Sequence, residues 1–155
     1  MEEINTNPEI SSEIPRFLNV LCILTFIGAG IGLLGGIYNL IKAPTALADF
    51  EQKQEMMADM PSNGFMMKMM DMAHENAINA YPLAASAIGA NLFCLVGAYM
   101  MRKKQKAGYY AYLVGQVFGI ATPAALMSFS IFLVIGTIPV IAFIIMYSIN
   151  LKHMS

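Results

Sequence analysis

The 155-residue sequence contains no tryptophan, only two cysteines, and few charged residues, which make up 12% of the chain. This scarcity of charge excludes an ordinary soluble domain, in which about a quarter of the residues are charged. The net charge of −1 provides no broad basic surface, so nucleic acid is not expected as a partner. Cys22 and Cys94 both stand in apolar stretches, where a cysteine is ordinarily a small buried hydrophobic residue with a free thiol.

Long apolar stretches take the place of the missing charges. Hydrophobic residues make up 57% of the chain, and the mean hydropathy is +0.59. Four stretches are free of Asp, Glu, Lys and Arg and have about the length of a membrane-spanning helix, namely 17–41, 80–101, 109–127 and 131–149. The sequence therefore predicts an all-α, polytopic membrane protein that is a single four-helix transmembrane domain. The tails would be 1–16 and 150–155.

The basic residues predict the orientation of these spans. Arg16, a cluster in the loop 102–108, and Lys152 would share one side of the membrane, opposite the segment 42–79. The positive-inside rule then places both termini and the basic loop in the cytoplasm, in the plasma (inner) membrane of the cell. The loop residues would set the topology or contact anionic lipid headgroups, and they are Arg102, Lys103, Lys104 and Lys106.

Small residues recur at every fourth position within three of the spans. Such spacing lets helix backbones approach closely in lipid, where small side chains mark helix contacts. The predicted packing residues are Gly28, Gly32 and Gly36 in the first span, Ala90, Cys94 and Ala98 in the second, and Ala111, Gly115 and Gly119 in the third. Packing within one bundle and contact between subunits both fit this pattern.

The segment 42–79 predicts an amphipathic helical hairpin outside the membrane. Its first helix would begin near Pro44 with Thr45 as the cap, and residues 61–64 would form the turn. The second helix would continue into the second span and bend near Pro82.

Methionine is concentrated in this outer segment. Met56, Met57, Met60, Met66, Met67, Met69, Met70 and Met72 all fall there, together with His74. Thioether sulfur suits Cu(I), and on a helix Met67, Met70 and His74 would share one flank, which makes a three-ligand metal site. Methionine is also a flexible filler of amphipathic faces that receive a partner or lie on a membrane, and the stripe fits that interpretation too.

Residues 73–83 resemble the entry to the second helix of the membrane-associated eicosanoid and glutathione metabolism family, which also comprises four-helix chains of similar length. The family pattern there, Arg-Ala-His-x-Asn-x-x-Glu-x-x-Pro, contributes to binding glutathione. The matching residues are Ala73, His74, Asn76 and Pro82. The chain departs from the pattern at Met72, which replaces the arginine, and at Asn79, which replaces the glutamate. The resemblance implies a divergent glutathione-dependent membrane enzyme.

The sequence is therefore consistent with three functions. The leading hypothesis is a non-catalytic accessory or interaction subunit without a cofactor, whose partners are membrane lipids and other membrane subunits or further copies of itself. It rests on the close-packing glycines and on the lack of Asp, Glu, Lys, Arg or His inside the spans, the residues that mark proton-coupled transporters. Cu(I) binding by the outer segment and glutathione-dependent chemistry are the alternatives.

Overall fold

A computed structural model describes residues 16–57, 63–127 and 131–151, excluding the side chains of residues 131 and 132. The described parts are helical and contain no strand, which confirms the all-α expectation for them. The helices are α1 (Arg16–Lys42), the short 3₁₀ helix η1 (Ala43–Thr45), α2 (Ala46–Met57), α3 (Gly64–Ile78), α4 (Ala80–Arg102), α5 (Lys106–Leu126) and α6 (Ile131–Asn150).

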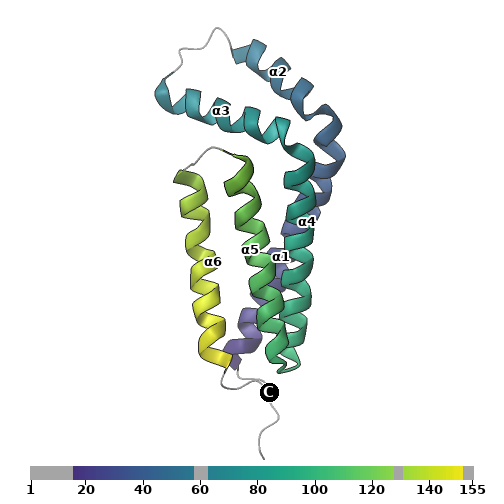
Figure 1. Cartoon of the computed structure of the whole chain (residues 1–155), viewed down its shortest axis with the longest axis vertical. Coiled ribbons are helices and arrows are strands. Elements are labelled where there is room, and N and C mark those ends of the chain that lie inside the picture. Colours follow the sequence, from purple (N-terminus) through teal and green to yellow (C-terminus); the bar gives the residue numbers. More distant parts are fainter. Residues whose placement is uncertain (1–15, 58–62, 128–130, 152–155) are drawn as a thin grey trace, which may run out of the picture.

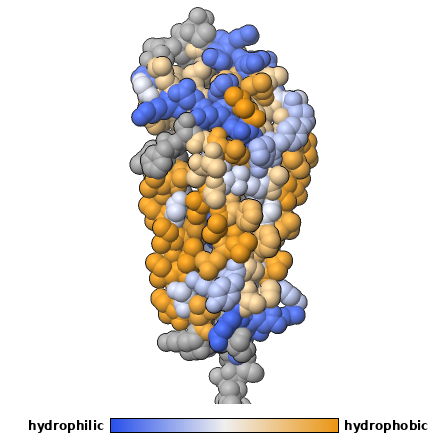
Figure 2. All heavy atoms as spheres, in the orientation of Figure 1, coloured by the Kyte–Doolittle hydropathy of each residue, from blue (hydrophilic) through white to orange (hydrophobic). Residues whose placement is uncertain are grey.

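Three helical segments are long and apolar enough to cross a membrane. They are Arg16–Met57, Ala80–Arg102 and Leu133–Asn150. The remaining predicted span, 109–127, falls within α5, whose hydropathy is lowered by tyrosines, glycines and Gln116. On the face that Figure 2 shows, an apolar belt covers the bundle, and hydrophilic residues gather beyond it at both ends. Several helices are therefore compatible with membrane insertion.

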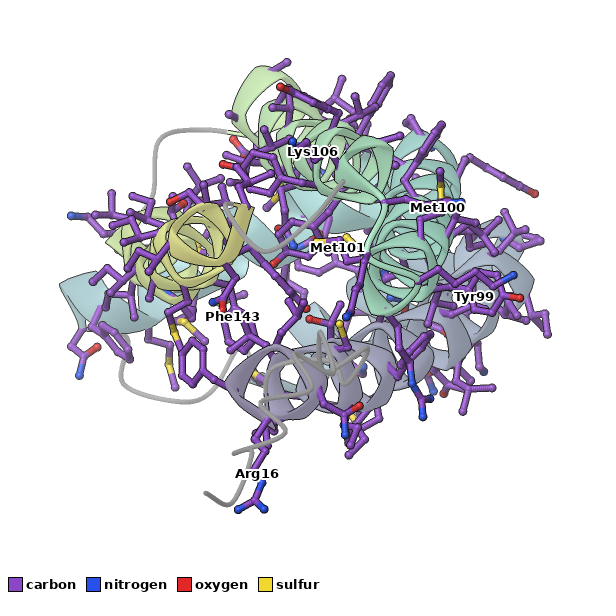
Figure 3. All side chains as sticks on the ribbon, turned by 90° about the horizontal axis from the view of Figure 1, so that it is seen from below. Arg16, Tyr99, Met100, Met101, Lys106 and Phe143 are labelled. Atoms are coloured by element: carbon purple, nitrogen blue, oxygen red, sulfur yellow. The ribbon has the colours of Figure 1, made fainter. Side chains whose placement is uncertain are left out.

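The core of the bundle lies at the end where α1 begins and α4 ends (Figure 1). Its fully buried side chains come from α1, α4 and α6, and they are Leu18, Leu21, Cys22, Met101 and Tyr147. Viewed from this end, Met101 points into the space between the helices, whereas Arg16 and Tyr99 point outward (Figure 3). The hydroxyl groups of Thr25 on α1 and Tyr147 on α6 share a hydrogen bond of 2.7 Å, which joins the first helix of the described chain to the last.

The helices α4 and α5 run antiparallel and are joined by a very short turn. Lys104 in this turn has a φ of 60°, a left-handed conformation often found just after a helix ends. The nitrogen of Gln105 then donates to the carbonyl of Met100 at 3.1 Å. Because α5 already begins at Lys106, the basic loop is shorter than the predicted range 102–108.

The segment between α1 and α4 forms the two helices α2 and α3, which lie beyond the end of the bundle opposite the core (Figure 1). The chain passes from α1 through η1 into α2 without leaving helical geometry. Thr45 differs from its predicted capping role because its hydroxyl donates to the carbonyl of Lys42 at 3.2 Å and lies 3.3 Å from a carboxylate oxygen of Asp49. Asn63 caps α3 by accepting a hydrogen bond of 2.9 Å from the nitrogen of Met66.

The chain turns from α3 into α4 at Asn79, three residues before the bend predicted at Pro82. The reason is that proline has no N–H, so Pro82 cannot bond to the carbonyl four residues earlier. Asn79 instead donates its side-chain amide to the carbonyls of Glu75 at 3.0 Å and Leu126 at 3.1 Å. The second bond fixes the base of α3 to the end of α5.

Candidate functional site

The predicted metal ligands Met67, Met70 and His74 all lie on α3, and the structure brings two of them to one crevice. Met70 and His74 line a crevice of about 140 Å³ between α2 and α3, together with Phe50, Gln54 and Asp71. Met67 does not line it, and its side chain is 58% exposed. Within the described residues, His, Cys, Asp and Glu side chains form no group of three or more suited to holding a metal ion.

His74 also has a packing role. Its ring lies against the ring of Phe50, with centroids 5.1 Å apart and planes inclined by 34°. This contact joins α3 to α2 and holds the two helices of the hairpin together. An aromatic neighbour on one face of the imidazole leaves its ring nitrogens at the edge, where they remain able to bind a ligand.

A cavity lies between the hairpin and the bundle. It has a volume of about 610 Å³, within the usual range for small-molecule sites. Tyr38, Asn39 and Lys42 line it from the end of α1, and Ala46, Asp49, Phe50 and Lys53 line it from α2. The opposite wall, from α3 and α4, is formed by the four alanines Ala73, Ala77, Ala80 and Ala84, together with Asn76 and Leu83.

Below this cavity, which we call the upper cavity, α1 and α4 are in close contact. A β-carbon on Gly36 would lie 2.9 Å from a side-chain carbon of Ile88, so the two helices are in close contact at that level. Gly32 lies against Asn91, whose side-chain oxygen would be 2.5 Å from a β-carbon there. Four of the six residues that line the cavity from α3 and α4 are alanines, whose small side chains leave the space open.

Two smaller cavities lie deeper in the bundle, between α6 and the other helices. One of about 420 Å³ borders α4, α5 and α6, and one of about 200 Å³ also borders α1. Both are lined by Asn91, Cys94, Gln116 and Val140. The nitrogen of Gln116 lies 3.5 Å from the sulfur of Cys94. These spaces show that α6 packs less tightly than α1, α4 and α5 do.

The predicted packing residues differ in how closely they contact the neighbouring helices. Gly115 is in tight contact, since a β-carbon on it would lie 2.7 Å from the carbonyl oxygen of Ala90. Ala90, Cys94 and Ala98 are buried, whereas Ala111 is half-buried. A β-carbon on Gly119 would lie 3.5 Å from Ala90, an ordinary contact, and one on Gly28 would meet no described neighbour within 4 Å.

Sequence reasoning missed the close backbone contact between Gly97 on α4 and Gly108 on α5. A β-carbon on Gly97 would lie 2.7 Å from the carbonyl oxygen of Gly108, and one on Gly108 would lie 2.6 Å from that of Gly97. Neither glycine belongs to a predicted every-fourth-position series. The sequence does contain a pattern that could have predicted this contact. Gly97 and Gly108 are equally far in sequence from the centre of the short turn, as are Ala90 and Gly115, and such residues meet in an antiparallel helix pair.

The predicted lipid-contacting residues gather at the end of the bundle that holds the core. Arg102, Lys103 and Lys106 are exposed, and Lys104 is half-buried within the turn. The ammonium of Lys103 lies 4.5 Å from the centroid of the Tyr99 ring, a cation–π geometry. An aromatic ring beside a lysine is typical of the membrane interface.

Comparison of the chain with protein-family models, with curated proteins and with solved structures finds no match. The residues that resemble the glutathione-binding pattern lie on both sides of the bend, because His74 and Asn76 are on α3 and Pro82 is in the first turn of α4. Glutathione-dependent chemistry stays a prediction.

Proposed function

We propose that this chain is a non-catalytic, four-crossing membrane protein that serves as an interaction subunit, and that its outer hairpin, α2 with α3, binds the partner. The observation that carries this proposal is the exposure of large apolar side chains on the hairpin, beyond the apolar belt (Figure 2). They include Met56, Phe65 and Met67, at 69%, 64% and 58%. Exposed apolar patches outside a membrane mark interaction surfaces.

The fourth crossing is α5. Its antiparallel contact with α4 at Gly97 and Gly108 supports a position of α5 beside α4 in the membrane. Residues 109–127 also carry no charge. The basic turn between α4 and α5 then faces the cytoplasm with both termini, and the hairpin faces the other side of the plasma (inner) membrane. The spans 17–41, 80–101, 109–127 and 131–149 correspond to α1, α4, α5 and α6.

The charge of the hairpin favours a protein partner over the bilayer surface. Segment 42–79 has three lysines against six Asp and Glu residues, a net charge of −3. Amphipathic helices that lie on membranes are instead rich in Lys and Arg on their polar face, because membrane surfaces are anionic. Methionine side chains adapt to the shape of a partner, which suits them to such an interface. The partner is therefore another membrane protein with an extramembrane surface.

Purification in native lipid, followed by mass spectrometry of the chains that co-purify, tests this function. We expect one stoichiometric partner with the wild-type protein. The double variant Met56→Asn with Phe65→Asn should lose it, whereas Lys68→Gln on α3 should retain it as the matched control. A monodisperse monomer without a stoichiometric partner would contradict the proposal.

Cu(I) binding is the second candidate, favoured by the shared crevice of Met70 and His74. A thioether and an imidazole are both ligands of Cu(I), and Met67 would have to turn inward to complete the predicted set. Titration of the full-length protein with Cu(I) should show at least tenfold weaker binding for Met70→Leu and His74→Gln. Met57→Leu, on α2 and outside the crevice, should bind as the wild type does. Equal affinities for all four proteins would eliminate this site.

A further inference from the structure

We propose that the upper cavity binds a zwitterionic phospholipid of the ethanolamine type, with the lipid phosphate on Lys42 and the lipid ammonium on Asp49. The cavity is the space of about 610 Å³ between the end of α1, α2, α3 and the start of α4. This inference concerns a lipid ligand and goes beyond the binding of a protein partner to the outer side of the hairpin.

The cavity lies at the level of lipid headgroups. Its walls include the last two turns of α1 and the first turns of α4, where the apolar belt gives way to hydrophilic residues (Figure 2). Tyr38 lines the cavity, and Tyr81 is exposed in the first turn of α4. Tyrosine gathers at the membrane interface, because its ring prefers lipid and its hydroxyl prefers water.

Three charged residues line the cavity, namely Lys42, Asp49 and Lys53, so the carboxylate of Asp49 stands between two lysines in the sequence. Lys42 ends α1, and Asp49 stands seven residues further along the same continuous helical segment, about 10 Å at the usual helical rise. Seven residues make nearly two turns, so both side chains emerge on one face. A lysine ammonium is a suitable point charge for phosphate, and a carboxylate accepts hydrogen bonds from a primary ammonium.

Asp49 is what selects the ethanolamine headgroup. Its side chain is half-buried, and one carboxylate oxygen lies 3.3 Å from the hydroxyl of Thr45. Among the charged residues that line the cavity, Lys42, Asp49 and Lys53, only Asp49 is acidic, so it is the group that can pair with a lipid ammonium. A choline headgroup has three methyl groups in place of the ammonium protons and cannot donate to the carboxylate.

The opposite wall leaves room for the ligand. Ala73, Ala77, Ala80 and Ala84 lie along it at intervals of three or four residues, on one face of α3 and α4. Their methyl groups form a smooth surface for the glycerol backbone and the start of an acyl chain. A larger side chain at Ala77 or Ala80 would occupy the space itself.

Binding of short-chain phospholipids to the detergent-purified, full-length protein tests this inference separately from any partner. We expect the wild type to bind phosphatidylethanolamine at least tenfold more tightly than phosphatidylglycerol or phosphatidylcholine. Lys42→Gln should weaken phosphatidylethanolamine binding about tenfold, and Asp49→Asn should abolish the preference for ethanolamine over glycerol. Lys68→Gln, whose side chain does not line the cavity, should change neither. Circular dichroism of each variant verifies that it folds.

A filling variant provides an independent arm. Ala80→Leu should reduce binding of all three lipids, because it takes up the space rather than altering charge. Equal wild-type affinities for the three lipids, a preference for phosphatidylglycerol, or a folded Asp49→Asn protein that retains its preference would each overturn the assignment. If no protein partner co-purifies but the lipid binding is as expected, only the proposed interaction function is contradicted.

Discussion

Gly97 on α4 and Gly108 on α5 lie backbone against backbone, each so close that a β-carbon on it would approach the other's carbonyl oxygen within 2.7 Å. This contact brings the backbones of the two helices together without a side chain between them. It also fixes the register of α4 against α5, because the turn between them is too short to allow another. The pair therefore determines the position of α5 in the bundle.

A side chain at Gly97 should destabilise the fold. Gly97→Ala would force the two helices apart, at a cost of about 1–3 kcal/mol for overpacking, less the ~1 kcal/mol by which alanine favours a helix. Reversible unfolding in mixed detergent micelles would measure it. The control is Gly35→Ala, because a β-carbon on Gly35 meets no described atom within 4 Å and should leave stability unchanged or slightly raised. Equal effects of the two substitutions would contradict the contact.

Removing the hydrogen bond between Thr25 and Tyr147 should loosen α6. Tyr147 is fully buried, and its hydroxyl lies 2.7 Å from that of Thr25. We expect a coupling energy of about 0.5–1.5 kcal/mol between Thr25→Val and Tyr147→Phe in a double-mutant cycle, the range known for such bonds between membrane helices. Unfolding of the two single variants and the double variant gives this energy. Strict additivity would show that the bond contributes nothing.

Asn79 should control how firmly the hairpin is attached. Its amide donates to the carbonyls of Glu75 and Leu126, and Asn79→Ala removes both bonds. We expect amide hydrogens of α3 to exchange about fivefold faster, corresponding to ~1 kcal/mol for a lost hydrogen bond. Hydrogen exchange followed by mass spectrometry measures the rates. Asn76→Ala, an exposed asparagine on the same helix, is the control and should leave exchange unchanged.

The order of the helices could be predicted well from the sequence, because charge and hydropathy mark the boundary between lipid and water. The four predicted stretches coincide with α1, α4, α5 and α6 within a few residues at each end, and three of these helices are long and apolar enough to cross a membrane. The position of the bend at Asn79 is harder to predict, because Pro82 leaves unbonded the carbonyl four residues before it and so breaks the helix there and not at the proline itself. The side-chain amide that stabilises the bend bonds to Leu126, which is distant in the sequence.

The candidate site could be predicted only in part. Methionine spacing indicated an amphipathic α3, but it could not show that Phe50 lies against His74 or that Met67 stands outside the crevice of Met70. Those facts depend on how α2 crosses α3. The upper cavity depends similarly on how α2 and α3 pack against the ends of α1 and α4, which no local pattern encodes.

Cysteine accessibility should establish the fourth crossing. After replacement of Cys22 and Cys94 by alanine, single cysteines at Gln54 and Met127 should react with an impermeant thiol reagent from outside intact cells. A cysteine at Gln105 should react only after the membrane is opened. Met127 and Gln105 lie at the two ends of α5, so labelling of both from the same side would show that α5 does not cross.

Photo-crosslinking from Phe65 in living cells tests the central claim, that the hairpin binds another membrane protein. A photoreactive amino acid at Phe65, whose side chain is 64% exposed on α3, should yield one discrete crosslinked product with a second protein. The same amino acid at Ile138, 61% exposed on the apolar face of α6, should yield none. Crosslinking to no protein from Phe65, at full expression of the variant, would contradict the account.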